Sequence, residues 1–314
     1  MRSQIAAILN VKGHNRMALR LMQCGGTARM LGGVSKTTCQ LVWCCERCAW
    51  VRSRKAGDLA AACIRHVHEQ DPGGVFLFFT VVVPRMKDPA RQVGLIKKLL
   101  KAGRRRRTSS LSSVGGSFLL IEPAKSFSHG HWDMHGHGLF YVPGEAVPGL
   151  GRGQRSAGAE GASSVRPRIL TAIEIGLRDA VVAAAASQGI QIAPTSRLGQ
   201  RLAHVEVLSA QRSWLYEGRR RVLAEQLEDD ARRIAEYAWA PGKSVQHEPL
   251  KLTAADHVLL QLADMGPCIV RSGAFRGIPR IERLIQEARA RLPDDRQMEF
   301  ESWVKCHASG MEEG

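Results

Sequence analysis

The sequence lacks the features that would place it in a membrane. No run of about 18 uninterrupted apolar residues occurs, so no transmembrane helix is predicted. The first residues also lack an apolar signal core, because Asn10, Lys12 and His14 interrupt the apolar positions there. We therefore expect a cytoplasmic protein without a membrane partner. Its eight cysteines are then expected to be free or metal-bound rather than paired in disulfides.

Acidic residues are scarce relative to basic ones. The 314 residues include 45 Lys and Arg but only 29 Asp and Glu, which gives a formal net charge of +16. An excess of this size favours an anionic partner, either nucleic acid or an acidic membrane surface. A metal-dependent hydrolase of small molecules would leave this charge without a role.

The order of apolar runs and turn signals predicts an α+β protein. Residues 75–83 form an unbroken Phe- and Val-rich run typical of a central strand. Further strands are expected at 117–122, 138–142, 204–208 and 268–271, and helices at 49–68, 89–102, 168–188, 211–237 and 280–291. These elements mix without a clean βαβ alternation, which favours a mainly antiparallel central sheet flanked by helices.

Composition divides the chain into parts. Residues 1–70 are basic and cysteine-rich, and we expect them to form a zinc- and DNA-binding segment. Residues 71–285 hold the expected sheet and helices, and residues 286–314 form a polar tail. The stretch 144–166 is rich in Gly, Ser, Ala and Pro and is expected to be a flexible surface insertion.

Four of the eleven histidines lie within nine residues, as two His-x-His pairs. Side chains two apart on a strand point to the same face, so such a pair can present two imidazoles to one metal ion. The pair His135 and His137 runs directly into the strand expected at 138–142. We prefer it to His129 and His131, which precede a polar Trp-Asp step typical of a loop.

A carboxylate would complete a site for a hard metal ion. Glu122 ends the strand before the histidines, and on an adjacent antiparallel strand it would face the same ion. Histidines and a carboxylate with open coordination positions suit Mn²⁺ or Mg²⁺ as a Lewis acid on a phosphate oxygen, with Zn²⁺ also open.

The cysteines predict a second metal site. Cys45-Glu-Arg-Cys48 is a Cys-x-x-Cys knuckle, and with Cys39 and Cys24 it supplies four thiolates for one structural zinc ion. Cys44 is a spare that could replace Cys45. The isolated cysteines are interpreted as packing residues, namely Cys63, Cys268 and Cys306.

Together with a helical tyrosine, these features occur in the order that typifies the initiators of plasmid rolling-circle replication, which are HUH endonucleases. The chain resembles that family from about residue 24 to 285. Each motif has a counterpart in this sequence: the cysteine segment in Cys39–Cys48 with Arg52, Arg54 and Lys55, the first core motif in 76–84 with Thr80, the second in Glu122 and His135-Gly-His137, the third in Tyr237, and a C-terminal element in 266–275.

The resemblance implies nicking and rejoining of single-stranded origin DNA. A divalent ion held by His135, His137 and Glu122 would polarise the scissile phosphate. Tyr237 would then attack it to form a 5′-phosphotyrosyl link, with Lys243 stabilising the phenolate or the phosphate. The expected partners are plasmid DNA, contacted through the cysteine segment and its arginines and lysine, and a host helicase.

The sequence also departs from the family pattern. Gly136 replaces a larger residue between the histidines, and Ala240 stands at the lysine position of the third motif. Arg233 occupies the place where some relatives carry a Glu that activates water at termination, so the termination residue stays open. A relaxase or single-strand transposase shares this chemistry. A non-catalytic, zinc-containing DNA-binding regulator is the alternative from another class.

Overall fold

The computed structural model describes residues 1–30, 33–105, 110–122, 131–146, 159–192, 202–211, 224–239, 253–263, 265 and 268–290, without the side chains of 27–36, 100–105, 110, 159–169 and 237–239. The elements in chain order are α1 (Arg2–Val11), α2 (Asn15–Met22), β1 (Thr27–Met30), β2 (Gly33–Lys36), α3 (Glu46–Gln70), β3 (Val75–Val82), α4 (Pro89–Arg105), η1 (Ser110–Ser113), β4 (Gly116–Glu122), β5 (His135–Val142), η2 (Gly144–Ala146), α5 (Ala159–Ala186), β6 (Ala203–Val207), α8 (Ala224–Trp239), α10 (Ala254–Leu262), β7 (Ile269–Gly273) and α11 (Ile281–Ala290).

Five strands form one sheet in the order β6-β3-β5-β4-β7, and every neighbouring pair is antiparallel. This confirms the predicted α+β class with an antiparallel sheet. The strand that begins at His135 is the middle one of the five. Its register pairs His137 with Thr80 of β3, and His135 with Glu122 of β4. Because directly paired residues share a face, these four side chains lie on the same side of the sheet.

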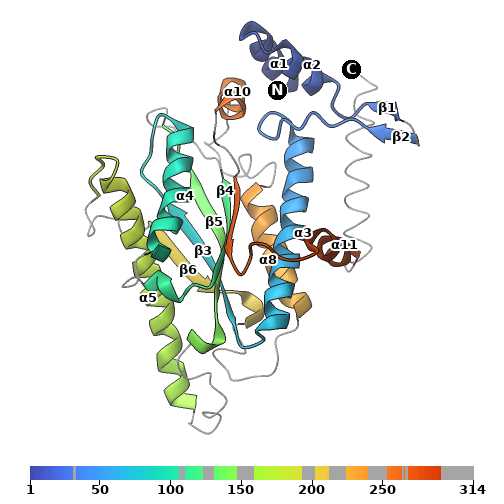
Figure 1. Cartoon of the computed structure of the whole chain (residues 1–314). Coiled ribbons are helices and arrows are strands. Elements are labelled where there is room, and N and C mark those ends of the chain that lie inside the picture. Colours follow the sequence, from blue (N-terminus) through green and yellow to red (C-terminus); the bar gives the residue numbers. More distant parts are fainter. Residues whose placement is uncertain are drawn as a thin grey trace.

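Helices cover both faces of this sheet (Figure 1). On one side α3 and α8 pack together, and the ring of His68 from α3 lies 6.4 Å from that of Phe76. Phe76 and Thr80 are four residues apart on β3 and therefore share a face, so the histidine pair, which lies beside Thr80, faces the α3–α8 side. On the other side lie α4 and α5, where Ile96 of α4 packs against Gly136.

That packing explains the small residue between the two histidines. A Cβ at Gly136 would lie 2.7 Å from Val81 Cγ1 and 3.1 Å from both Ile96 Cγ2 and Leu119 Cδ1. The position is buried under α4, on the face opposite the imidazoles. Gly136 therefore permits the close approach of α4 while leaving the His-x-His spacing unchanged.

The N-terminal part has a hydrophobic cluster of its own. Ile5 and Leu9 of α1 and Leu21 of α2 are buried together with the cysteines and with Val258 of α10. The strands β1 and β2 form a separate antiparallel hairpin beside it. In Figure 1 these helices lie beyond the N-terminal end of α3, away from the sheet. None of the helices, within the residues described, is long and apolar enough to cross a membrane.

The structure differs from the sequence prediction mainly in four segments. The N-terminal lead carries two helices that composition did not predict. The expected insertion at 144–166 is helical at both ends, because η2 begins it and α5 starts at Ala159, while 147–158 lie outside the described residues. The helix expected at 211–237 is observed as α8 from Ala224, with 212–223 outside the description. Of the expected tail, residues 286–290 belong to α11 and the rest is not described.

Candidate metal centres

Four buried thiols converge in the N-terminal part of the chain. The sulfur atoms of Cys24, Cys39, Cys45 and Cys48 all lie within 4.8 Å of one another. The Cys48 sulfur is 3.4 Å from that of Cys39 and 3.6 Å from that of Cys24, which is 3.5 Å from the Cys45 sulfur. A metal ion about 2.3 Å from each sulfur of a tetrahedron separates the sulfurs by about 3.8 Å. The spacing therefore fits one ion bound by four thiolates.

Local structure brings these cysteines together. Cys45 is the extended N-cap residue of α3, and Cys48 lies in the first turn, so the knuckle straddles a helix start. Gly25 has a φ of +101°, which turns the chain sharply after Cys24, and a Cβ there would lie 2.7 Å from Arg47 Nη1. The backbone N–H of Cys39 donates to the Cys24 sulfur at 3.4 Å. This bond favours thiolate character at Cys24.

The thiol environment agrees with this geometry. Hydrogen bonds from Cys39, Cys45 and Cys48 hold the pKa of Cys24 well below the ordinary thiol range. Hydrogen bonding to Cys24 raises the pKa of both Cys39 and Cys45. Thiolate character is therefore favoured at Cys24, and an incoming cation displaces the thiol protons of the cluster. Arg2 lies beside Cys24, with Nη1 donating to the Cys24 carbonyl at 3.3 Å.

Cys44 does not belong to the cluster. Its sulfur donates to the backbone carbonyl of His257 in α10 at 3.5 Å, and burial raises its pKa to about 12. The structure thus separates two adjacent cysteines that the sequence left interchangeable. Cys63 and Cys268 are buried in the main core, as their interpretation as packing residues predicts, and Cys306 lies outside the described residues.

The second candidate centre lies at one end of the main sheet. One ligand atom each from Glu122, His135 and His137 lies within 4.8 Å of the others, so this group can hold a metal ion. Glu122 Oε2 is 2.7 Å from His137 Nε2, and the rings of His135 and His137 are 6.1 Å apart at 82°. Of the other predicted pair, His131 is not part of this group and His129 lies outside the described residues.

Neighbouring side chains orient His137. Thr80 Oγ1 lies 3.1 Å from its Nδ1, and the Phe78 ring is parallel to the imidazole within 3°. When Nδ1 carries the proton and donates to Thr80, the lone pair of Nε2 points to the Glu122 side and is free for a metal ion. His137 is buried, whereas the His135 side chain is 31% exposed. The site therefore has one buried imidazole and one that solvent can reach.

Asp133 is a further carboxylate near the site, which the sequence analysis did not single out. Its Oδ1 lies 3.5 Å from His135 Nε2, and its Oδ2 accepts a hydrogen bond from Arg85 Nε at 3.2 Å. Burial alone would raise the pKa of Asp133, but His135 and Arg85 outweigh burial and lower it. The only sequence signal was its place two residues before the His-x-His pair.

The third expected component, Tyr237, belongs to α8, but its side chain is not among those described. Lys243 and Ala240 lie outside the described residues altogether. The course of α8 is nevertheless set by its contacts with α3. Arg65 near the end of α3 pairs with Glu225 and Glu228 near the start of α8, at 2.9 and 2.6 Å. The two helices are therefore antiparallel.

The other end of this helix pair lies level with the histidines. Ser53 Oγ donates to the Glu236 carbonyl at 3.4 Å, about 26 Å along α3 from its last residue. A short turn joins α3 to β3, which runs back in the opposite direction (Figure 1). Val82, the partner of His135, lies about 23 Å along that strand. The C-terminal turn of α8 and the His–His–Glu group therefore lie at the same end of the molecule, on the same face of the sheet.

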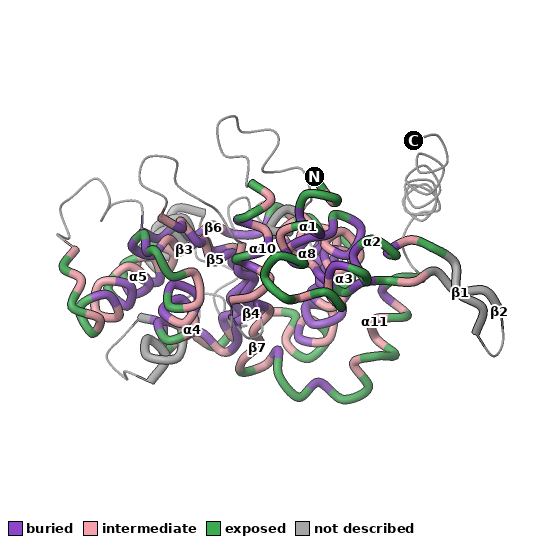
Figure 2. Tube along the Cα trace, turned by 90° about the horizontal axis from the view of Figure 1, so that it is seen from above, coloured by how far each residue is buried: buried purple, intermediate pink, exposed green. Residues whose placement is uncertain are grey.

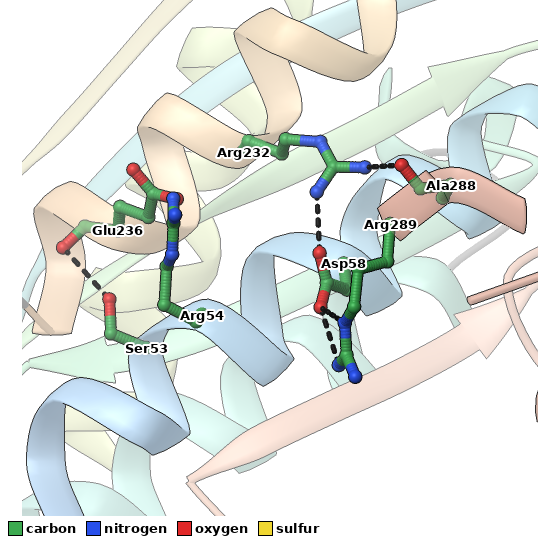
Figure 3. Close-up of polar contacts among 7 residues, drawn as sticks. All are labelled: Ser53, Arg54, Asp58, Arg232, Glu236, Ala288 and Arg289. Atoms are coloured by element: carbon green, nitrogen blue, oxygen red, sulfur yellow. Dashed lines mark hydrogen bonds and ion pairs between the residues drawn. The ribbon is translucent and has the colours of Figure 1, made fainter. Parts of the chain in front are cut away.

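Buried ionic contacts fix α8 in this place (Figure 3). Arg232 Nη1 donates to Asp58 Oδ1 of α3, and its Nη2 donates to the Ala288 carbonyl of α11, both at 2.5 Å. Arg289 of α11 binds the second Asp58 oxygen at 2.8 Å. Gly57 of α3 faces the Arg232 backbone, where an added Cβ would lie at an ordinary van der Waals distance of 3.6 Å.

The expected DNA contacts on α3 are largely occupied by the protein itself. Arg54 Nη1 binds Glu236 Oε1 at 2.8 Å, and its guanidinium lies 5.2 Å from the centre of the Trp50 ring. Arg52 is half-buried, and this burial lowers its pKa. Lys55 is exposed. Only one of the three predicted side chains is thus fully presented to solvent.

The carboxylates nearest to position 237 are also engaged. Glu236 binds Arg54, and Asp230 Oδ2 accepts a hydrogen bond from the Ala210 backbone N–H at 2.8 Å. Arg233, one helical turn before position 237, is exposed. Within the described part of α8, every carboxylate near Tyr237 therefore has a structural partner.

Fold and sites together define an α+β protein with a four-thiol centre in its N-terminal part and a His–His–Glu group on the middle strand of its sheet. Comparison of the chain with models of known families, with curated proteins and with solved structures gives no match.

Proposed function

We propose that this protein is a metal-dependent endonuclease that nicks single-stranded DNA through Tyr237, in the manner of a rolling-circle replication initiator. The observation that carries the proposal is the meeting of Glu122, His135 and His137 on the sheet face beneath α8, whose C-terminal turn includes residue 237. The net charge of +16 suits a polyanionic substrate.

The residues present fit a divalent ion. Two imidazoles and one carboxylate leave coordination positions open for water and a phosphate oxygen, and Thr80 Oγ1 lies 3.1 Å from Nδ1 of the buried imidazole. When bound, Mn²⁺ or Mg²⁺ would supply Lewis-acid polarisation of the phosphate. Glu122 and His137, which bind each other at 2.7 Å, would turn toward the ion instead.

Helix geometry supports Tyr237 as the nucleophile. Position 237 follows Ile234 by three residues and Asp230 by seven, so the three belong to one stripe of the helix. Ile234 packs against the main core, and Asp230 binds Ala210 just after β6. The Tyr237 oxygen would attack the phosphorus and give up its proton to solvent. The bond to the 3′ oxygen breaks, and that oxygen leaves as a free 3′-hydroxyl while the 5′ phosphate stays on the tyrosine.

A covalent adduct tests this reaction directly. The full chain is incubated with Mn²⁺ and randomised single-stranded oligonucleotides labelled at the 3′ end, and labelled protein is detected after denaturing electrophoresis. We expect an adduct that Tyr237→Phe and His135→Ala abolish. Tyr141→Phe is the matched control, because Tyr141 lies at the opposite end of β5, where its hydroxyl binds Asp71.

The same experiment separates the alternatives. Absence of an adduct on oligonucleotides and on supercoiled plasmid, with metal bound at both centres, would favour the non-catalytic DNA-binding regulator. A relaxase or transposase would give the adduct, and would be recognised by joining of strands from two different molecules. We further propose zinc as the ion of the four-thiol centre, since four thiolates at these spacings suit tetrahedral Zn²⁺.

A further inference from the structure

The N-terminal helices carry charge of one sign only. The first 45 residues contain six Lys and Arg and no Asp or Glu. Three of these cations, Lys12, Arg16 and Arg20, are exposed on α2 and the turn before it. None of the three pairs with a carboxylate among the described residues. Such a surface repels itself and attracts a polyanion.

The two helices are joined by a turn of the length found in helix-turn-helix motifs. α1 and α2 are joined by Lys12, Gly13 and His14, and Gly13 has a φ of +80° that permits the tight turn. Ala18 and Leu21 of α2 are buried against the four-thiol cluster, which holds α2 in place from its inner side. The opposite side of α2 is exposed (Figure 2).

The exposed side of α2 carries the side-chain types that recognise base pairs. Asn15, Arg16, Arg20 and Gln23 are exposed, and Arg16, Arg20 and Gln23 follow the i, i+4, i+7 spacing of one helix face. Arginine binds guanine edges and phosphates, and Asn and Gln bind adenine edges. Leu19, 58% exposed between the arginines, supplies an apolar contact of the kind that a thymine methyl group accepts.

We infer that this α2 surface (Asn15, Arg16, Leu19, Arg20 and Gln23, with Lys12 beside it) is a duplex DNA-binding site separate from the His–His–Glu centre. It replaces α3, whose arginines are engaged within the protein, as the DNA-contacting element of residues 1–70. The inference rests on this surface alone, so it stands or falls independently of the nicking reaction.

Other polyanions fit the surface less well. Single strands are held by aromatic stacking, and residues 1–42 contain no Phe, Tyr or Trp. An RNA duplex hides its base edges in a deep and narrow major groove, whereas that of B-DNA is wide enough for a helix. A membrane-lying helix needs a continuous apolar face, whereas the exposed Leu19 and Met22 of α2 lie among the exposed Asn15, Arg16 and Arg20.

Fluorescence anisotropy with a mixed-sequence 30-base-pair duplex tests the inference on the full chain. The variant K12Q/R16Q/R20Q is compared with K98Q/R276Q/R280Q, which removes the same number of Lys and Arg charges from exposed positions elsewhere. We expect the first variant to bind about 10- to 100-fold more weakly at 0.15 M salt. Its log–log salt slope should be smaller by about 2 to 3, as for loss of phosphate contacts, while the control resembles the parent protein.

Equal duplex affinities of the two triple variants would overturn the inference. Binding to vesicles that contain phosphatidylserine is measured in parallel, and a K12Q/R16Q/R20Q variant that loses vesicle binding but keeps its duplex affinity would also overturn it. Metal content and circular dichroism show whether each variant keeps its fold. If the triple variant does not fold, Arg16→Gln and Arg20→Gln are compared singly with Arg276→Gln on the same criterion. The adduct assay on single-stranded DNA tests the nicking reaction separately from duplex binding. Tyr237→Phe should leave duplex affinity unchanged even if no adduct forms in any variant.

Discussion

At the scale of single residues, Gly136 joins the fold to the candidate site. Its Hα faces α4, with Val81 and Ile96 within 3.1 Å of any added Cβ, while its two neighbours present imidazoles on the other face. Gly136→Ala should destabilise the protein by about 1–3 kcal/mol through overpacking. Urea unfolding measures the change. Gly94→Ala is the control, since that helical position has open space and should gain up to about 1 kcal/mol.

Thr80 is the second residue whose effect can be isolated. Thr80→Val removes the hydroxyl that lies 3.1 Å from His137 Nδ1 but keeps the shape of the side chain. Loss of such an orienting partner typically lowers metal affinity about 10- to 100-fold. Calorimetric titration with Mn²⁺ measures it, with Thr80→Ser as the variant that retains the hydroxyl. Unchanged affinity in Thr80→Val would show that Thr80 does not set the tautomer of His137.

At the scale of helices, Asp58 joins three of them. It is buried on α3 and accepts hydrogen bonds from Arg232 of α8 and Arg289 of α11. Asp58→Ala leaves the buried Arg232 guanidinium without its counter-charge, which should cost about 3–5 kcal/mol in urea unfolding. Asp58→Ala with Arg232→Met removes both charges and should recover part of that loss. A double variant less stable than Asp58→Ala alone would show that the carbonyl contact of Arg232 to Ala288 carries most of the stability.

The main strands and several helices were predictable because their signals are local. Unbroken apolar runs between turn residues predict β3, β4 and β5, and a period of two predicts that His135 and His137 share a face. The pairing of Thr80 with His137 links residues far apart in sequence, so no local pattern reveals it. The same holds for the contact between Asp133 and Arg85, which are also far apart in sequence.

The missed helices have a different cause. α1 and α2 are short, and helices of 8 to 10 residues are marginal without tertiary packing. Their stability depends on burying Leu9 and Leu21 against cysteines that come later in the chain. Composition alone therefore indicates only a basic, glycine-containing segment and does not predict the two helices. The start of α5 was missed because Ser and Gly among its first residues are more typical of loops.

At the scale of the whole molecule, the two centres belong to two buried clusters. The thiols are packed among α1, α2 and α10, while the His–His–Glu group lies on a sheet with its own extensive core. Bound structural zinc contributes roughly 10–16 kcal/mol to small domains that need it for folding. Loss of the thiol centre should therefore loosen the N-terminal helices and spare the sheet.

Two adjacent cysteines allow this to be tested with a close control. Cys45→Ser removes one of the four clustered thiols, whereas Cys44→Ser changes a buried thiol that binds only the His257 carbonyl, a contact that a serine hydroxyl retains. We expect one zinc per chain in the parent protein and in Cys44→Ser, and substantially less in Cys45→Ser. Hydrogen exchange should then accelerate in α1 and α2 of Cys45→Ser, while amides of β3 and β5 keep their protection. Equal zinc content in the two variants, or equal loss of protection in helices and sheet, would contradict a separate metal-stabilised N-terminal module.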